Sequence, residues 1–178
     1  MFDCAHKQRR KAANMGIKDQ LTTEQFKAIY NGPFAAATYV STASGGGFEM
    51  VSELLSAGKF LGEQVKAGGE TGYGELVDGL LEDLRGMSKD EAKDASLKVE
   101  SKDPVAVRAQ TKEAVAAAGA TVAGMAGADG YKKWILDIAR TVAATKTGGF
   151  LGIGAKSVID EKEQAALDEL AASLQIGA

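Results

Sequence analysis

The residues best placed to do chemistry lie near the C-terminal end of the chain, in the sequence GGFLGIGAKSVIDEKE (148–163). A glycine-rich loop followed by lysine and serine is typical of phosphate binding, because successive backbone N–H groups wrap the phosphates and the lysine closes over them. Here Ala155 separates Gly154 from Lys156, and the preceding segment has the pattern of an amphipathic helix rather than of a strand. The sequence therefore favours a connector between helices, in which Phe150 and its apolar neighbours pack into the core, over a phosphate site.

Asp160 and Glu163, which follow this loop, are our candidate metal ligands. Carboxylate oxygens are the ligands that Mg²⁺ and Ca²⁺ prefer. The same pair is equally typical of a helix start, with an aspartate at the N-cap and a glutamate three residues later. Asp78, Glu82 and Asp83 form a second acidic group with the same two interpretations, a cation site or a solvated helix face. A structural role is favoured for both groups, a helix cap for the first and a solvated helix face for the second. A Mg²⁺ or Ca²⁺ site is kept as an alternative.

Histidine- and cysteine-based catalysis is excluded by composition, because the chain has one histidine, His6, and one cysteine, Cys4. A Ser-His-Asp or Cys-His site needs a base beside its nucleophile, and a di-iron bundle needs Glu-x-x-His pairs. We therefore expect no catalytic residues and no cofactor. An enzyme that uses carboxylates or Lys156 is kept only as an alternative.

Three aromatic residues are candidates for contact with a protein partner: Tyr131, Trp134 and Phe150. Tyrosine and tryptophan dominate the binding energy of many interfaces. Tyr131 and Trp134 also fit the apolar stripe of a helix, with Ile135, Ile138 and Val142 at the following positions, which is typical of a core. Both interpretations stay open at this point, with the core favoured.

Helices are the elements predicted to position these residues. Asn31-Gly32-Pro33 is expected to end the first helix, with Pro33 starting the next. No segment alternates apolar and polar residues with a period of two, so the sequence predicts an all-α protein, a compact bundle of six to eight helices with no sheet. The expected helices cover residues 22–30, 33–44, 48–66, 75–85, 104–126 and 131–144, and a last one that begins after Asp160.

The whole chain of 178 residues suits one domain, which we place at residues 15–178. Residues 1–14 show no periodicity, and Met15 is a possible natural start, so they are interpreted as a flexible or non-native extension. Residues 88–103 begin with an S-x-x-E capping box, are dense in both charge signs and contain little apolar surface. They are expected to form an exposed, charged connector.

Composition excludes further function classes. A formal net charge of −3 and a pI of about 5.3 do not suit nucleic-acid binding. No stretch reaches the roughly 18 strongly apolar residues that span a bilayer. We expect a cytoplasmic protein without stable membrane insertion. The many small residues at 116–124 allow close helix contacts, either inside the monomer or across a homodimer.

Two segments of the C-terminal half, ADGYKKWILDIA (128–139) and VIDEKEQAALDELAASL (158–174), resemble small bacterial helical proteins of unassigned function and, more loosely, the TerB-like helical domain of tellurite-resistance systems. The chain departs from the TerB-like pattern where residues 155–157 replace the expected acidic Asp-Gly step, so only Asp160 and Glu163 are carried over. The resemblance implies a stress-linked, membrane-associated or scaffolding context. Our expectation is a non-enzymatic module that binds a protein partner or itself, with a small-ligand or divalent-cation binder as the alternative.

Overall fold

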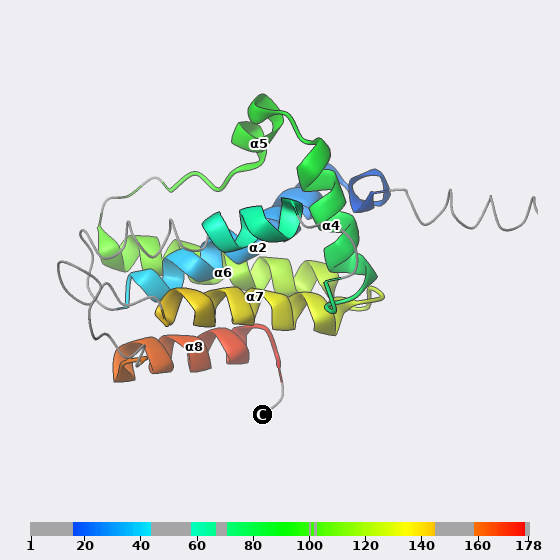
Figure 1. Cartoon of the computed structure of the whole chain (residues 1–178). Coiled ribbons are helices and arrows are strands. Elements are labelled where there is room, and N and C mark those ends of the chain that lie inside the picture. The colour runs from blue at the N-terminus through cyan, green and yellow to red at the C-terminus, as the bar shows by residue number, and fades with distance from the viewer. Residues whose placement is uncertain are drawn as a thin grey trace, which may run out of the picture.

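The computed structural model describes residues 16–43, 58–66, 71–99, 101, 103–144 and 159–176. Seven helical elements lie in these ranges, together with a further helical stretch at residues 58–66, and no strand occurs among the described residues. The predicted all-α fold is therefore confirmed (Figure 1). The elements are η1 (Ile17–Gln20), α2 (Thr23–Ser41), α4 (Glu75–Gly86), α5 (Lys89–Ala95), α6 (Pro104–Val122), α7 (Ala128–Ala143) and α8 (Glu161–Ser173).

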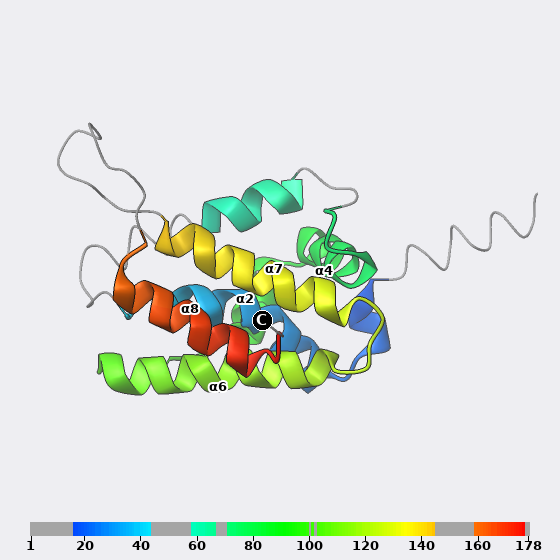
Figure 2. The same ribbon diagram turned by 90° about the horizontal axis from the view of Figure 1, so that it is seen from below.

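Helix α2 is the centre of the bundle. It packs most extensively on α6, then on α7, and also contacts α8, α5 and η1. Alanine side chains make these close contacts possible, because Ala35, Ala36 and Ala37 are almost completely buried. Figure 2 shows α6, α7 and α8 arranged around α2. None of the helices described here is long and apolar enough to span a membrane.

The prediction that Asn31-Gly32-Pro33 ends the first helix is wrong. Residues Thr23–Ser41 form one continuous helix with Pro33 inside it. A proline in a helix interior removes one donor, which leaves the carbonyl four residues earlier without its usual partner. That carbonyl belongs to Ile29, and it accepts a hydrogen bond from the hydroxyl of Tyr131. The tertiary fold thus compensates for the proline.

Helix α7 begins earlier than predicted, at Ala128 rather than at Tyr131. Gly127 has a φ of 83°, a left-handed conformation that favours glycine, and it ends the preceding turn. Gly130, which falls in the gap between the two helices predicted at 104–126 and 131–144, lies inside the first turn of α7. A Cβ at this position would overlap the carbonyl oxygen of Tyr73. Glycine is therefore needed here for close packing against Tyr73, and not for a turn of the chain.

Most other helix boundaries lie close to the predicted ones. Helix α4 ends at Gly86, one residue beyond the prediction, and α6 begins at Pro104 with Asp103 as its N-cap but ends at Val122. Three reciprocal capping boxes are present, among them those expected at Ser88 and Asp160. Their first residues are Thr22, Ser88 and Asp160.

The connector at 88–103 begins with α5 and continues with mostly exposed side chains, apart from the buried Ala95. The buried Asn31 of α2 bonds to two backbone groups of this segment. The Nδ2 group of Asn31 donates to the carbonyl oxygen of Ala95 at 2.8 Å, and its Oδ1 accepts from the backbone N–H of Leu97 at 2.7 Å. Asn31 holds the charged segment against the bundle together with the Lys18–Glu91 ion pair and the hydrogen bond that Nε2 of Gln110 donates to the carbonyl of Lys98.

Candidate functional site

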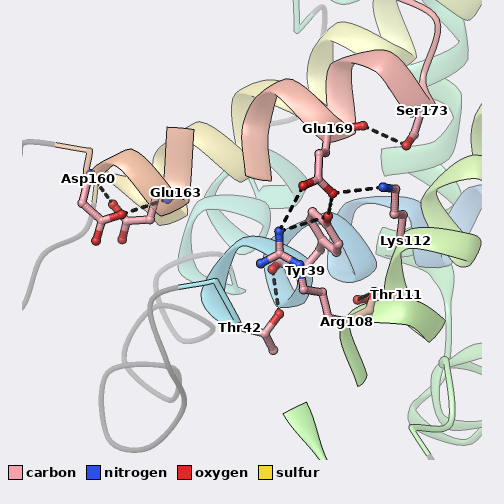
Figure 3. Close-up of polar contacts among 9 residues, drawn as sticks. All are labelled: Tyr39, Thr42, Arg108, Thr111, Lys112, Asp160, Glu163, Glu169 and Ser173. Carbon is pink, nitrogen blue, oxygen red and sulfur yellow. Dashed lines mark hydrogen bonds and ion pairs between the residues drawn. The ribbon is translucent and has the colours of Figure 1, made fainter. Parts of the chain in front are cut away.

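The candidate metal ligands Asp160 and Glu163 lie together at the start of α8, where they form a capping box (Figure 3). An Asp160 side-chain oxygen accepts from the backbone N–H groups of Lys162 and Glu163, both at 2.9 Å, and a Glu163 oxygen accepts from the backbone N–H of Asp160 at 2.8 Å. The described residues contain no group of three or more acidic, histidine or cysteine side chains that could hold a metal ion. The geometry is that of a helix cap, and the cation site stays a prediction.

The second acidic group does not act as a unit. Asp78 accepts two hydrogen bonds from Thr71, whereas Asp83 accepts from the backbone N–H of Lys18 at 2.8 Å. Glu82 pairs with an arginine in its own helix. Each of the three carboxylates therefore has a separate structural partner.

Two candidate interaction residues, Tyr131 and Trp134, lie in the interior of the bundle. Both have no exposed surface, and the centroids of their rings are 6.0 Å apart. The hydroxyl of Tyr131 donates to Ile29, and Nε1 of Trp134 donates to Oε1 of Gln64 at 2.7 Å. A partner therefore reaches neither ring in this conformation. Phe150 and the glycine-rich segment up to Ser157, including Lys156, lie outside the described residues.

The structure brings together a polar cluster that the sequence analysis did not identify: Tyr39 of α2, Arg108 and Lys112 of α6, and Glu169 of α8 (Figure 3). The Tyr39 hydroxyl donates to the Glu169 carboxylate. Lys112 Nζ lies 3.0 Å from the same carboxylate, and Arg108 donates to the Tyr39 hydroxyl at 3.1 Å. The guanidinium carbon of Arg108 also lies 4.4 Å from the centroid of the Tyr39 ring, a cation–π distance. The cluster joins three helices that are far apart in the sequence.

These contacts shift the pKa values of the side chains in the cluster. Burial, followed by the hydrogen bond to Glu169, raises the pKa of Tyr39. The pKa of Glu169 is lowered, chiefly by the hydrogen bond from Tyr39 and then by the one from Lys112. Hydrogen bonding to Glu169 raises the pKa of Lys112. The carboxylate and the ammonium group thus stabilise each other's charged forms.

Only part of this polar cluster could be predicted from the sequence. Arg108 and Lys112 are four residues apart and so share one helix face. In the hydroxyl-rich segment TYVST (38–42), the hydroxyls of Thr38, Ser41 and Thr42 bond to backbone carbonyls of the preceding turn, as such hydroxyls commonly do in helices. The different role of Tyr39 depends on contacts between distant segments, which periodicity cannot show.

The two cations of the cluster border the outer face of α6, which is the candidate functional surface of this protein. The inner face of α6, with the fully buried Thr111, Val115 and Ala118, packs into the bundle. The exposed charges on or beside this face come from Glu113 and from Lys112, whose side chain is 44% exposed, and Figure 2 shows α6 at the edge of the bundle. Its other exposed side chains are small or apolar: Val105, Ala109, Ala116, Ala117, Ala120 and Ala123.

Helix α6 also uses its small residues inside the monomer. Leu174, at the end of α8, lies 3.2 Å from where a Cβ of Gly119 would be. Gly119 therefore permits the close contact between α6 and α8. The small residues at 116–124 thus divide into two groups, one that packs against α8 or α2 and one that faces outward.

Comparisons with family models, with curated proteins and with solved structures find no match for this chain. The resemblance to TerB-like domains therefore stays a prediction, and the function is argued from the structure alone.

Proposed function

We propose that this protein is a non-enzymatic interaction module that associates through the outer face of α6, with a second copy of the chain as its partner. The observation that carries the proposal is the composition of this exposed face. Along a helix of 19 residues, the exposed positions between Val105 and Ala123 are all apolar or alanine apart from Glu113, with the half-exposed Lys112 beside them. A helix on the surface of a monomer normally places polar and charged residues on its outward face.

Exposure of the largest apolar side chain on this face supports the same proposal. Val105 has a relative exposure of 75%, the highest among the exposed large apolar residues that the structure describes. Monomeric proteins rarely expose extended apolar patches, and a patch rimmed by polar groups is typical of an interface. Arg108 and Lys112 lie at one edge of this face and are part of such a rim.

The small side chains on the outer face of α6 also allow a second helix to pack against it. Because Ala116, Ala117 and Ala120 project little from the helix, a second helix can approach the backbone of α6 closely. A self-complementary face is what a two-fold symmetric dimer requires, since the same patch is then used on both copies. A helix of this length offers a contact surface about 28 Å long.

The experiment is a concentration series on the purified chain by light scattering and native mass spectrometry. We expect dimers that dissociate on dilution, and Ala120→Lys should abolish them because it places a charge at the contact. Ala165→Lys is the matched control, since Ala165 is an exposed alanine on α8. Monomers at every concentration, or dimers that Ala120→Lys leaves intact, would contradict the proposal.

A further inference from the structure

Helix α6 carries two neighbouring residues of opposite charge, Lys112 and Glu113, halfway along its outer face. Glu113 is exposed, and no hydrogen bond or ion pair to its side chain occurs among the described residues. Lys112 lies on the flank next to α8, where its Nζ is 3.0 Å from the Glu169 carboxylate while its side chain stays 44% exposed (Figure 3). Glu113 is therefore a carboxylate without a counter-charge, in the middle of a face that is otherwise small or apolar.

The polar cluster beside this face has the opposite imbalance. Arg108 and Lys112 supply two positive charges, and the single carboxylate of Glu169 lies 3.7 Å from the first and 3.0 Å from the second. An ammonium group has three donors, and Lys112 uses one of them in this contact. Glu113 would balance the surplus, but adjacent residues of one helix do not face each other. Only Glu113 of another chain can approach Lys112 from the outer side.

The exposed positions of α6 are arranged symmetrically about the peptide bond between Lys112 and Glu113. Two pairs of exposed residues lie at equal distances along the sequence on either side of this bond. In a two-fold contact between antiparallel helices, each residue faces its counterpart across the centre, and the counterpart faces it in return. The pairs that face each other across this centre are Val105 with Ala120, Ala109 with Ala116, and Lys112 with Glu113.

We propose that the second copy packs on α6 in the antiparallel direction, with Glu113 of each copy paired with Lys112 of the other. This inference rests on the proposed association through the outer face of α6. Parallel helices around a two-fold axis would bring Glu113 of both copies together, and like charges that face each other are unfavourable. Antiparallel packing replaces this repulsion by two ion pairs, and it places the bulkiest side chain of the face, Val105, against an alanine.

Cysteine cross-linking tests the direction, in a Cys4→Ser background that removes the native cysteine. A disulfide needs Cβ atoms about 4 Å apart, so mixed Ala109→Cys and Ala116→Cys chains should form linked dimers at least about fivefold faster than either variant alone. A mixture of Ala109→Cys with Ala165→Cys is the control, because Ala165 is an exposed alanine of α8. Faster linking within the pure variants, or no excess of mixed dimers, would overturn the antiparallel direction.

Charge substitutions test the ion pairs separately. Glu113→Lys should raise the Kd of the dimer about tenfold, because two attractive contacts become repulsive. Glu75→Lys makes the same change at an exposed glutamate of α4 and should leave the Kd unchanged. Lys112→Glu should also weaken the dimer, and mixing it with Glu113→Lys should restore association, since each chain then supplies one sign of charge. The melting temperature of Lys112→Glu is measured alongside, because Lys112 also pairs with Glu169.

The outcomes distinguish this inference from the proposed association itself. A dimer that Ala120→Lys abolishes but that Glu113→Lys leaves unchanged would keep the α6 interface and overturn the pairing of Lys112 with Glu113. A wild-type chain that is monomeric at every concentration would overturn both. Dimers that show the mixed cross-link and the restored association would support the antiparallel arrangement.

Discussion

The hydroxyl of Tyr131 in α7 donates a hydrogen bond to the carbonyl oxygen of Ile29 in α2, at 2.5 Å. This is the carbonyl that loses its helical partner because Pro33, four residues later, has no N–H. Gly32 permits the contact, since a Cβ there would overlap the Tyr131 hydroxyl. Four residues from two helices thus form one arrangement, in which a side chain of α7 supplies the hydrogen-bond donor that the backbone of α2 lacks.

Tyr131→Phe should lower the free energy of unfolding by about 1–3 kcal/mol, because it leaves a buried carbonyl without a donor. Pro33→Ala restores an N–H to the helix at the required position. We therefore expect Tyr131→Phe to cost clearly less in a Pro33→Ala background than in the wild type. Urea unfolding of the two single variants and the double variant measures this coupling. Additive effects would show that the Tyr131 hydroxyl does not replace the missing donor.

The same arrangement explains why the sequence predicts two helices where the structure has the single helix α2. Asn-Gly-Pro is a strong local signal for a turn, and proline in a helix interior costs about 3 kcal/mol. Two features override it, the deep burial of α2 and the hydroxyl supplied by Tyr131, which lies 102 positions from Ile29. By contrast, the stripe through Trp134, Ile135 and Ile138 is a pattern of local spacing, and all three are fully buried as predicted.

Asn31 offers a test of how the charged connector is held. Asn31→Leu keeps the approximate volume but leaves the backbone N–H of Leu97 and the carbonyl of Ala95 without their partner. We expect a loss of about 1–3 kcal/mol in unfolding free energy and faster hydrogen exchange at Leu97. Ser96→Ala is the control, because the exposed Ser96 hydroxyl bonds only to the carbonyl of Ala92 in its own turn. Unchanged exchange at Leu97 in Asn31→Leu would show that the segment is fixed by other contacts.

The contribution of Glu169 to stability should depend on pH. Its pKa is lowered in the folded state by Tyr39 and Lys112, so the carboxylate stabilises the fold above the unfolded-state pKa of about 4.3. That stabilisation is lost as the pH falls through the lower pKa of the folded state. Because the side chain is 45% exposed, we expect an effect below about 1 kcal/mol.

The measurement compares urea midpoints of the wild type and Glu169→Gln at pH 7, 5 and 3. The variant should be less stable at pH 7, and the difference should shrink toward pH 3. The exposed Glu113 on α6 provides the control substitution Glu113→Gln. A difference between wild type and Glu169→Gln that is the same at all three pH values would rule out the carboxylate charge as its source.

The candidate sites differ in how far the sequence could predict them. The capping pair of Asp160 and Glu163 is a local motif, and the structure places both residues as their spacing indicates. The cluster of Tyr39, Arg108 and Glu169 depends on how three helices pack, and no local pattern encodes that. The outward direction of Ala120, and the inward direction of Gly119, likewise became clear only from the neighbours of α6.

Substitutions of Asp160 distinguish the two interpretations of the acidic start of α8, a helix cap and a cation site. As an N-cap, Asp160 accepts from two backbone N–H groups, so Asp160→Ala should lower the unfolding free energy by about 0.5–2 kcal/mol in the absence of any divalent cation. Asp160→Ser retains a capping oxygen and should restore most of this stability while removing the carboxylate.

A cation site predicts a different pattern across the same variants. Binding of Mg²⁺ or Ca²⁺ at a hundred times its Kd would stabilise the wild type by about 2.7 kcal/mol, and Asp160→Ser would lose that gain. We expect the melting temperature of the wild type to change equally with MgCl₂, CaCl₂ and NaCl at matched ionic strength, because the carboxylates of Asp160 and Glu163 already accept backbone hydrogen bonds. A cation-specific shift that Asp160→Ser abolishes would instead establish the metal site.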